Sequence, residues 1–260
     1  MSSAPCITVA PNGARRQKTD HPALPISPQD LAETARDCFA EGAWTIHLHV
    51  RDQDGAHSLD AGLYKTAIAA VHRAAPHMDI QITTEAADRY SVEDQLHLLE
   101  TLKPAAASIA VREIARAPKL IAQVYDTAHR HGTQVQHILY GTECIAQLEL
   151  WLASGLVPTT MRDAILVLGQ YAPARAGKSS ELAPLLKQTA ACNFSISVCA
   201  FGPDEQACLT EAAALGCDLR VGFENNLHAP EGNVWENNAQ AVSSLRTRLK
   251  TQSERHAHAD

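Results

Sequence analysis

The sequence predicts a single-domain α/β protein of the (β/α)₈ TIM-barrel class, and three observations support this prediction. The chain has 260 residues, close to the roughly 250 that such barrels need. Short runs of β-branched and apolar residues alternate with amphipathic helical stretches from end to end, the pattern of βαβ units around a parallel sheet. No Gly/Ser/Pro-rich linker divides the chain, which favours closure into a barrel over an open sheet.

Eight segments have the length and composition of strands. They are residues 6–10, 45–50, 79–84, 106–111, 134–140, 161–168, 194–201 and 218–223. Ser27 caps a helix whose first residue is Pro28, and Gly42 closes that helix. Ser91 opens the helix after the third strand. Further helices are expected over residues 119–130, 143–153 and 205–215.

Composition excludes several classes of protein. The net charge of -7 argues against nucleic-acid binding, which favours a basic face. The seven cysteines form no C-x-x-C pair and indicate free thiols in a reducing compartment. Without a signal peptide or a membrane-spanning apolar run, we expect a soluble, cytoplasmic protein with no membrane partner. We expect residues 1–250 to form the barrel and residues 251–260 a disordered tail.

Two histidines stand near the end of the second predicted strand. Alternate residues of a strand share a face, so His47 and His49 should point into the barrel while Ile46 and Leu48 point toward the helices. Buried imidazoles need partners, and imidazole is a preferred ligand of zinc. The pattern indicates a metal site, and a pair of hydrogen-bonded core histidines is the alternative.

A glutamate at the end of the eighth predicted strand completes a candidate set of ligands. Alternation places Arg220, Gly222 and Glu224 on the barrel axis. Strands two and eight both flank strand one in a closed barrel, which brings Glu224 toward the histidines at the rim where barrel active sites lie. A His₂Glu set leaves a coordination position open, as in catalytic zinc sites. An Arg220–Glu224 ion pair is the alternative.

Motifs along the chain resemble those of the β-keto acid cleavage enzymes. The matching segments are I-T-V-A-P-N-G-A at residues 7–14, L-P-I-S at 24–27, E-G-A at 41–43, H-L-H-V-R-D at 47–52, D-G at 54–55 and R-V-G-F-E-N-N at 220–226. They occur in the right order and span nearly the whole chain, although the middle matches only loosely.

This resemblance implies a zinc-bearing barrel that condenses a β-keto acid with acetyl-CoA, giving acetoacetate and a new CoA thioester. A metal ion with open positions suits this reaction, because it can chelate the oxygens of a β-keto acid and stabilise enolate charge. Arg220 matches an arginine that assists charge development in the family. The resemblance also implies a homotetramer whose other partners are small molecules.

Several positions depart from the family pattern. Asn225 stands where the family has the acid that serves as base, and an amide cannot take a proton from carbon at neutral pH. Another group is then needed, such as a water held by the metal and Glu85. Gln136 replaces an inward acid expected on the fifth strand, and Arg15 replaces an acidic residue.

Hydroxyl groups and one arginine are the candidate substrate ligands. Thr83 and Thr84 lie where family members carry a hydroxyl near the substrate carboxylate, and Ser108 offers another. Gln136 joins them by its place in the alignment. Because Arg15 reverses the charge at its position, we expect a β-keto acid whose distal group is anionic or accepts hydrogen bonds.

Two other functions remain open. A metal-dependent hydrolase of the amidohydrolase type also uses H-x-H, but on its first strand and with histidines from strands five and six. Here His137 is predicted to face outward, and strand six offers only Asp163. A barrel that binds metal and a small acid without turnover would explain Asn225. Arg175 and Lys178 are candidate contacts for CoA phosphates, or else a solvated loop.

Overall fold

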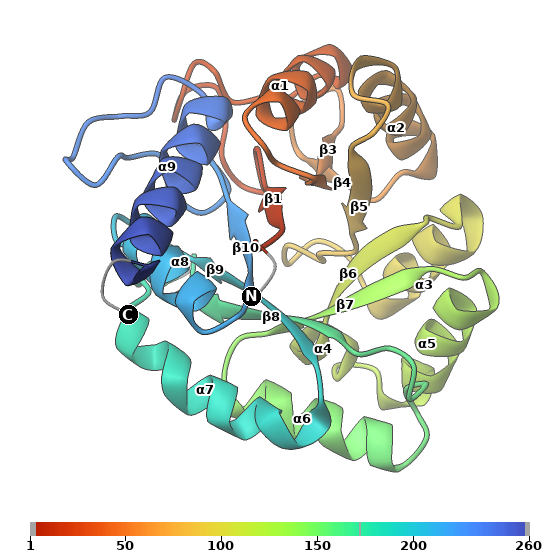
Figure 1. Ribbon diagram of the computed structural model, residues 1–260. Helices are drawn as coiled ribbons and strands as arrows, with labels where there is room; N and C mark the ends of the chain where they lie inside the picture. The colour runs from red at the N-terminus through yellow and green to blue at the C-terminus, as the bar shows by residue number, and fades with distance from the viewer. Residues whose placement is uncertain (1–3, 172, 258–260) are drawn as a thin grey trace.

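The computed structural model describes residues 4–171 and 173–257. Parallel strands form a closed barrel in the order β1-β10-β9-β8-β7-β6-β5-β2, with helices around it (Figure 1). These strands are β1 (Ile7–Val9), β2 (Thr45–Leu48), β5 (Asp79–Thr83), β6 (Ala106–Ala110), β7 (Gln134–Leu139), β8 (Asp163–Leu168), β9 (Ser195–Ala200) and β10 (Asp218–Val221). The predicted (β/α)₈ fold is confirmed, and each predicted strand overlaps one strand of the barrel.

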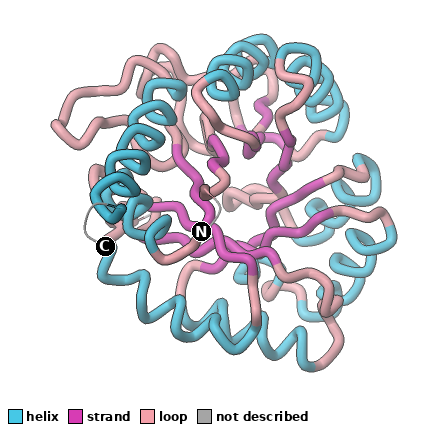
Figure 2. The backbone as a smooth tube through the Cα atoms, in the orientation of Figure 1, coloured by secondary structure: helices cyan, strands magenta, loops and turns pink. Residues whose placement is uncertain are grey.

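Helices form the outer layer, as Figure 2 shows. They are α1 (Pro28–Ala40), α2 (Ala61–Ala74), α3 (Val92–Leu102), α4 (Val111–Ile114), α5 (Ile121–Arg130), α6 (Thr142–Ala153), α7 (Leu182–Thr189), α8 (Glu205–Ala214) and α9 (Asn238–Ala257), with 3₁₀ turns η1 (Pro118–Leu120), η2 (Ser179–Glu181) and η3 (Ala190–Cys192). The predicted start of α1 is confirmed, because Ser27 and Asp30 form a capping box before Pro28. None of the helices in the described part of the chain has both the length and the apolar composition that a membrane span requires.

A short hairpin follows β2 where the sequence predicts one longer strand. Val50–Arg51 (β3) pairs antiparallel with His57–Ser58 (β4). The intervening turn is held by the Asp52 carboxylate, which accepts hydrogen bonds from two main-chain N–H groups. This turn chemistry bends the chain back before a longer strand can continue.

The C-terminal helix is longer than the sequence predicts. Helix α9 continues through Ala257, whereas a disordered tail is expected from residue 251. Its first half packs against α1 and α8, where Ala241, Val242 and Leu245 are buried. An anchored helix gains one hydrogen bond for each residue added, so a polar continuation can remain helical. Residues 258–260 of the expected tail lie outside the described residues.

The barrel interior has an apolar wall and a polar wall. The apolar wall comes from β6 to β9 and consists of Ala110, Ile138, Ile165, Val167 and Cys199. The opposite wall carries buried polar side chains, among them His47 on β2, Gln81 on β5 and Arg220 on β10. His47, Gln81 and Arg220 therefore lie on neighbouring strands on one side of the barrel axis.

Candidate metal centre

Strand β2 sets the positions of His47 and His49. It lies between β1 and β5, and its Ile46 and Leu48 belong to the core shared with the helices. The two imidazoles alternate with these residues and are 1% and 0% exposed. His47 faces Gln81 on β5, whose Oε1 lies 2.7 Å from His47 Nδ1. The alternation predicted from the sequence is thus confirmed.

A turn after β10 carries Glu224. Gly222 has a φ of 142°, and a Cβ there would lie 2.5 Å from the carbonyl oxygen of Ala10, so only glycine fits. The Asn238 side chain accepts a hydrogen bond from Phe223 N at 2.9 Å, and Glu224 N donates to the Ala10 carbonyl at 3.0 Å. Strand β1 lies between β2 and β10, as predicted. The bond to Ala10 ties the turn to the end of β1, and the bond to Asn238 ties it to the start of α9.

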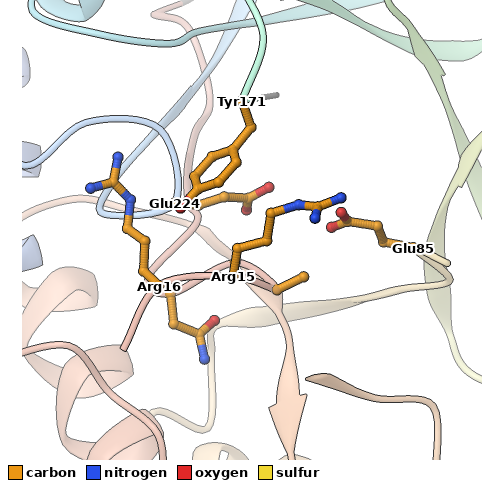
Figure 3. Close-up of a pocket in the computed structure, with 8 residues that line it drawn as sticks. Arg15, Arg16, Glu85, Tyr171 and Glu224 are labelled. Atoms are coloured by element: carbon orange, nitrogen blue, oxygen red, sulfur yellow. The ribbon is translucent and has the colours of Figure 1, made fainter. Parts of the chain in front are cut away.

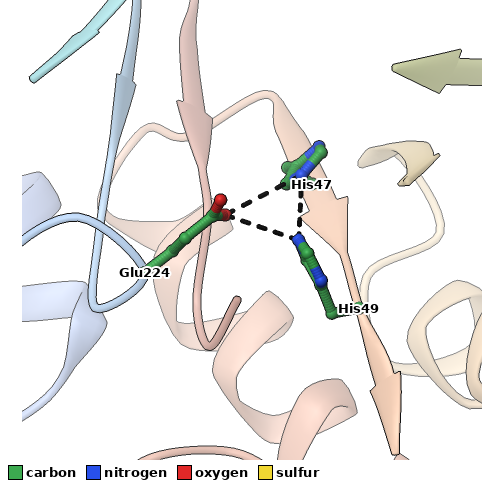
Figure 4. Close-up of side chains that lie close together, drawn as sticks. All are labelled: His47, His49 and Glu224. Atoms are coloured by element: carbon green, nitrogen blue, oxygen red, sulfur yellow. Dashed lines mark hydrogen bonds and ion pairs between the residues drawn. The ribbon is translucent and has the colours of Figure 1, made fainter. Parts of the chain in front are cut away.

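His47, His49 and Glu224 converge on one point (Figure 4). The Nε2 atoms of the two histidines are 3.2 Å apart. Glu224 Oε2 lies 3.8 Å from His47 Nε2 and 3.7 Å from His49 Nε2. A tetrahedral zinc ion with ligands at about 2.0–2.1 Å separates its ligand atoms by about 3.3–3.4 Å. The spacing in this cluster is close to that of a zinc site.

The chemistry of these donor atoms also fits a bound cation. Glu224 Oε2, the carboxylate oxygen that faces both histidines, is buried and has no hydrogen-bond partner among the described residues. Burial lowers the pKa of His47 to about 4, with a further contribution from the charge of Arg220. Burial also places the pKa of His49 well below its usual range. Neutral imidazoles and a carboxylate are the forms that bind zinc, so the residues present fit this metal.

Arg220 pairs with the other oxygen of Glu224. Its Nη2 lies 3.5 Å from Glu224 Oε1 and 3.3 Å from Cys199 Sγ, and the residue is buried. The ion pair that the sequence offers as an alternative is therefore present beside the cluster. The two are compatible, because Oε1 faces the guanidinium and Oε2 faces the histidines.

A cavity of about 30 Å³ adjoins the cluster (Figure 3). It is lined by Asn12, Gly13, Ala14, Arg15, Arg16, Glu85, Tyr171 and Glu224. The side chain of Arg15 extends toward Glu85 in Figure 3, and the guanidinium carbons of Arg15 and Arg16 each lie 5.8 Å from the centre of the Tyr171 ring. Carboxylates, guanidinium groups and a phenol thus surround the space next to the cluster.

Glu85 and His57 lie beside His49. Glu85 Oε2 is 3.9 Å from His49 Nδ1, and burial, followed by the charges of Glu224 and Glu113, raises the pKa of Glu85 to about 8. His57 Nε2 lies 2.8 Å from the Glu85 carbonyl, and its ring centre is 5.2 Å from that of His49. From the sequence, Glu85 is expected only to hold a water together with the metal. His57 is not expected at the site, because it reaches the cluster through the hairpin of β3 and β4, which the strand pattern does not predict.

The sequence matches a known family over nearly its whole length. The family model described as beta-keto acid cleavage enzyme matches residues 5–260. The chain belongs to the β-keto acid cleavage enzyme family. It is 24% identical over 247 residues to a 3-keto-5-aminohexanoate cleavage enzyme of Acetoanaerobium sticklandii, covering 92% of this chain and 89% of that protein. It is 30% identical over 111 residues to a 3-oxoadipate:acetyl-CoA acetyltransferase of Cupriavidus necator, covering 42% of this chain and 38% of that protein.

Solved structures share the barrel. A complex of ObcA with oxaloacetate has a TM-score of 0.73 at 18% identity, covering 89% of this chain and 64% of the ObcA chain. A 3-dehydroquinate dehydratase from Geobacillus kaustophilus has a TM-score of 0.63 at 12% identity, covering 97% of this chain and 92% of that one. This chain therefore spans less than two thirds of ObcA, and at these identities the likeness establishes the fold alone.

The hydroxyl groups that the family resemblance predicts near the substrate are held by hydrogen bonds on and after β5 and β6. Ser108 Oγ donates to Thr83 Oγ1 at 3.4 Å, and Thr83 Oγ1 accepts from Glu85 N at 3.0 Å. The Thr84 hydroxyl donates to the main-chain carbonyl of Ser108 at 3.0 Å. None of the three lines the cavity, and Thr84 alternates away from the inward face of β5.

Asn225 and Gln136 also lie away from this cavity. Asn225 is 1% exposed, and its amide has no hydrogen-bond partner among the described residues. Gln136 lies deeper and lines a second cavity, of about 340 Å³, at the ends where the strands begin. The alignment gives its strand and facing but not its depth, because inward side chains of a barrel form several layers. Gln136 therefore does not line the cavity beside the cluster, and its contact with substrate stays a prediction.

Residues that the hydrolase alternative and the expected CoA contact would use have other partners or positions. His137 faces the helices, as predicted, with Nε2 lying 3.3 Å from the carbonyl of Met161. Asp163 lies at the beginning of β8, at the opposite end of the barrel from the cluster. Arg175 in the expected CoA-binding loop contacts both carboxylate oxygens of Glu181, at 2.8 and 2.9 Å. The hydrolase pattern, with histidines from strands five and six, is not assembled at this cluster.

Proposed function

We propose that this protein is a zinc-dependent β-keto acid cleavage enzyme. The reaction converts R–CO–CH₂–COO⁻ and acetyl-CoA into acetoacetate and R–CO–CoA. The observation that carries the proposal is the convergence of His47, His49 and Glu224 beside a cavity of charged side chains. Membership of the family supports it, as do relatives named for β-keto acid cleavage and acetyl-CoA transfer.

The three clustered side chains would hold the zinc ion, and their number leaves a position for substrate. When bound, the metal stabilises the negative charge that develops on the ketone oxygen. Arg220 keeps a second positive charge beside Glu224, buried at the edge of the same cluster. A buried charge that is already oriented stabilises an anionic transition state without having to reorganise.

Glu85 is the proton acceptor in this proposal. Apart from Glu224, it is the one carboxylate among the described residues that line the cavity. Asn225 cannot accept the proton and does not line that cavity. The Glu85 carboxylate instead lies next to His49, at the rim where the substrate must enter.

The bond changes balance as follows. Glu85 takes a proton from the carbon between the ketone and the carboxylate, and that carbon forms a bond with the acetyl carbonyl carbon as the CoA thiolate leaves. The thiolate then attacks the original ketone carbon. The bond between that ketone carbon and the deprotonated carbon breaks, and R–CO–CoA is released. The proton returns from Glu85 to the same carbon, which is now the CH₂ carbon of acetoacetate.

Arg15 provides selectivity for the charge of the substrate. Its side chain is 35% exposed, lines the cavity and pairs with Asp88, which is 86% exposed, at 2.9 Å. A substrate carboxylate can replace such an exposed partner, because the pair is weak in water and guanidinium matches carboxylate geometry. We therefore propose a β-keto acid with an anionic distal group. The relative named for 3-oxoadipate, a β-keto dicarboxylate, supports this choice.

A product assay tests the proposed function. Zinc-loaded protein is incubated with a panel of β-keto acids and acetyl-CoA, and acetoacetate and the new acyl-CoA are both quantified. We expect equal amounts of the two products, with neither formed when a co-substrate is omitted. A hydrolase would form product without acetyl-CoA. A non-catalytic binder would be stabilised against heat by a β-keto acid and form no product.

A further inference from the structure

A chain of hydrogen bonds runs from His47 across the barrel interior. His47 Nδ1 lies 2.7 Å from Gln81 Oε1, Gln81 Nε2 donates to Gln136 Oε1 at 3.3 Å, and Gln136 Nε2 donates to Ser197 Oγ at 3.2 Å. The four residues come from β2, β5, β7 and β9. They stand where barrel interiors usually carry branched apolar side chains.

The direction of this chain determines which nitrogen of His47 carries the proton. A neutral imidazole has one N–H group. Gln81 presents its oxygen to Nδ1, so Nδ1 donates and Nε2 keeps its lone pair toward His49 and Glu224. If the Gln81 amide turned over, its NH₂ group would face Nδ1, and the proton would move to Nε2. A proton there would compete with a metal ion for the Nε2 lone pair and weaken its binding.

Gln136 opposes this reversal. In the observed orientation the Gln81 NH₂ group donates to Gln136 Oε1. If the Gln81 amide turned over, Gln81 Oε1 would face Gln136 Oε1, and two acceptor oxygens cannot form a hydrogen bond. Both amides would have to turn together, with the Ser197 hydroxyl changing from acceptor to donor, to restore a consistent chain. Gln81 is 8% exposed and lines the second cavity beside Gln136; a water there can bond to either end of the amide, so it would not restore the orientation that Gln136 imposes.

We infer that Gln136 is a positioning residue that sets the zinc affinity of His47 through Gln81. The inference rests on the proposed metal centre, and it gives Gln136 a different task from the substrate contact expected from the sequence. Loss of a partner that directly orients a ligating histidine typically weakens metal binding about 10–100-fold. For Gln136, one hydrogen bond further away, we expect a loss of about fivefold.

Three variants test this inference. Gln136→Met removes the acceptor, and Gln136→Glu keeps a group that, when ionised, can only accept. Gln134→Met is the matched control, because Gln134 lies on the same strand but donates to Asp163 at 2.8 Å. Zinc affinity is measured by competition with a chelator. The tautomer of His47 is measured by ¹⁵N NMR on the metal-free protein.

We expect Gln136→Met to bind zinc about fivefold more weakly and to populate both tautomers. Gln136→Glu should bind at least as tightly as the wild type, with the proton on Nδ1, and Gln134→Met should leave both measurements unchanged. If Gln136→Met does not fold, Gln136→Asn, which is too short to reach Gln81, replaces it.

An unchanged affinity and tautomer in Gln136→Met would overturn the inference while leaving the metal centre intact. A raised KM at unchanged zinc affinity would show instead that Gln136 contacts substrate. Absence of zinc binding by the wild-type protein would contradict the metal centre and the inference together.

Discussion

The Nε2 atoms of His47 and His49 face each other at 3.2 Å in a buried setting. Because His47 meets Gln81 through Nδ1, its Nε2 atom presents a lone pair to the second imidazole and to Glu224. Without a cation, one Nε2 carries a proton and donates to the other, which is the hydrogen-bonded pair of histidines that the sequence offers as the alternative; around a cation, both Nε2 atoms present lone pairs. The bond from His47 on β2 to Gln81 thus leaves free the Nε2 lone pair that would hold the metal of the proposed reaction.

Glu85→Gln should lower kcat by about 100-fold or more, because it removes the proposed proton acceptor and preserves the shape of the side chain. Zinc content is measured alongside, since Glu85 lies next to His49, and we expect it to be retained. Asn225→Asp places a carboxylate where the family has the acid that serves as base. Introduced into the Glu85→Gln variant, Asn225→Asp shows which position holds the base. Rescue of kcat there would transfer the role from Glu85 to position 225.

Arg15→Glu should shift substrate preference from a β-keto diacid toward a β-keto amino acid. Because the Arg15 side chain is partly exposed, we expect a change of about tenfold in the ratio of the two kcat/KM values, less than a fully desolvated pair would give. Lys18→Glu is the matched control, since Lys18 is a cation of the same loop that pairs with Asp30 and does not line the cavity. A wild-type preference for the amino substrate would contradict the role of Arg15.

His137 should make the protein less stable in mild acid. Burial lowers its pKa from the ordinary 6.5 to about 4 in the folded chain. The unfolded chain therefore takes up the proton first as pH falls, and stability is lost from about pH 6.5 down to about pH 4. Between pH 7.5 and pH 5 this amounts to about 2 kcal/mol.

His47, His49 and His57 contribute losses of the same sign, because burial lowers their pKa values too. The His137 contribution is isolated by comparing urea unfolding of the wild type with that of His137→Phe at both pH values. The variant should lose about 2 kcal/mol less between pH 7.5 and pH 5. Equal losses in the two proteins would show that His137 is accessible to protons in the folded state.

The period-two alternation of strands, taken together with barrel closure, predicts that His47, His49 and Glu224 cluster. It placed His47 and His49 on one inward face, and the neighbours of strand one in a closed barrel brought Glu224 to the same rim. Both inferences depend only on local geometry and on barrel closure, so they hold although the middle of the chain matches the family loosely.

Depth within the barrel and the geometry of loops could not be predicted in the same way. Strand alternation predicts that Gln136 points into the barrel, but the depth of its side chain along the barrel axis depends on how the strands are staggered. His57 reaches the cluster through a turn that the Asp52 carboxylate stabilises, an interaction with no periodic signal. The tail beyond residue 250 is helical through Ala257, because packing earlier in α9 supports it despite its polar composition.

Zinc binding by the purified protein tests the central claim most directly. After removal of bound metal by a chelator, the wild type is titrated with Zn²⁺ beside His49→Ala and the control His137→Phe, a buried histidine that faces the helices. We predict about one ion per chain for the wild type and for His137→Phe, and none at this site for His49→Ala, with all three proteins folded. A wild type that binds no zinc, or a His49→Ala variant that binds it undiminished, would contradict the account.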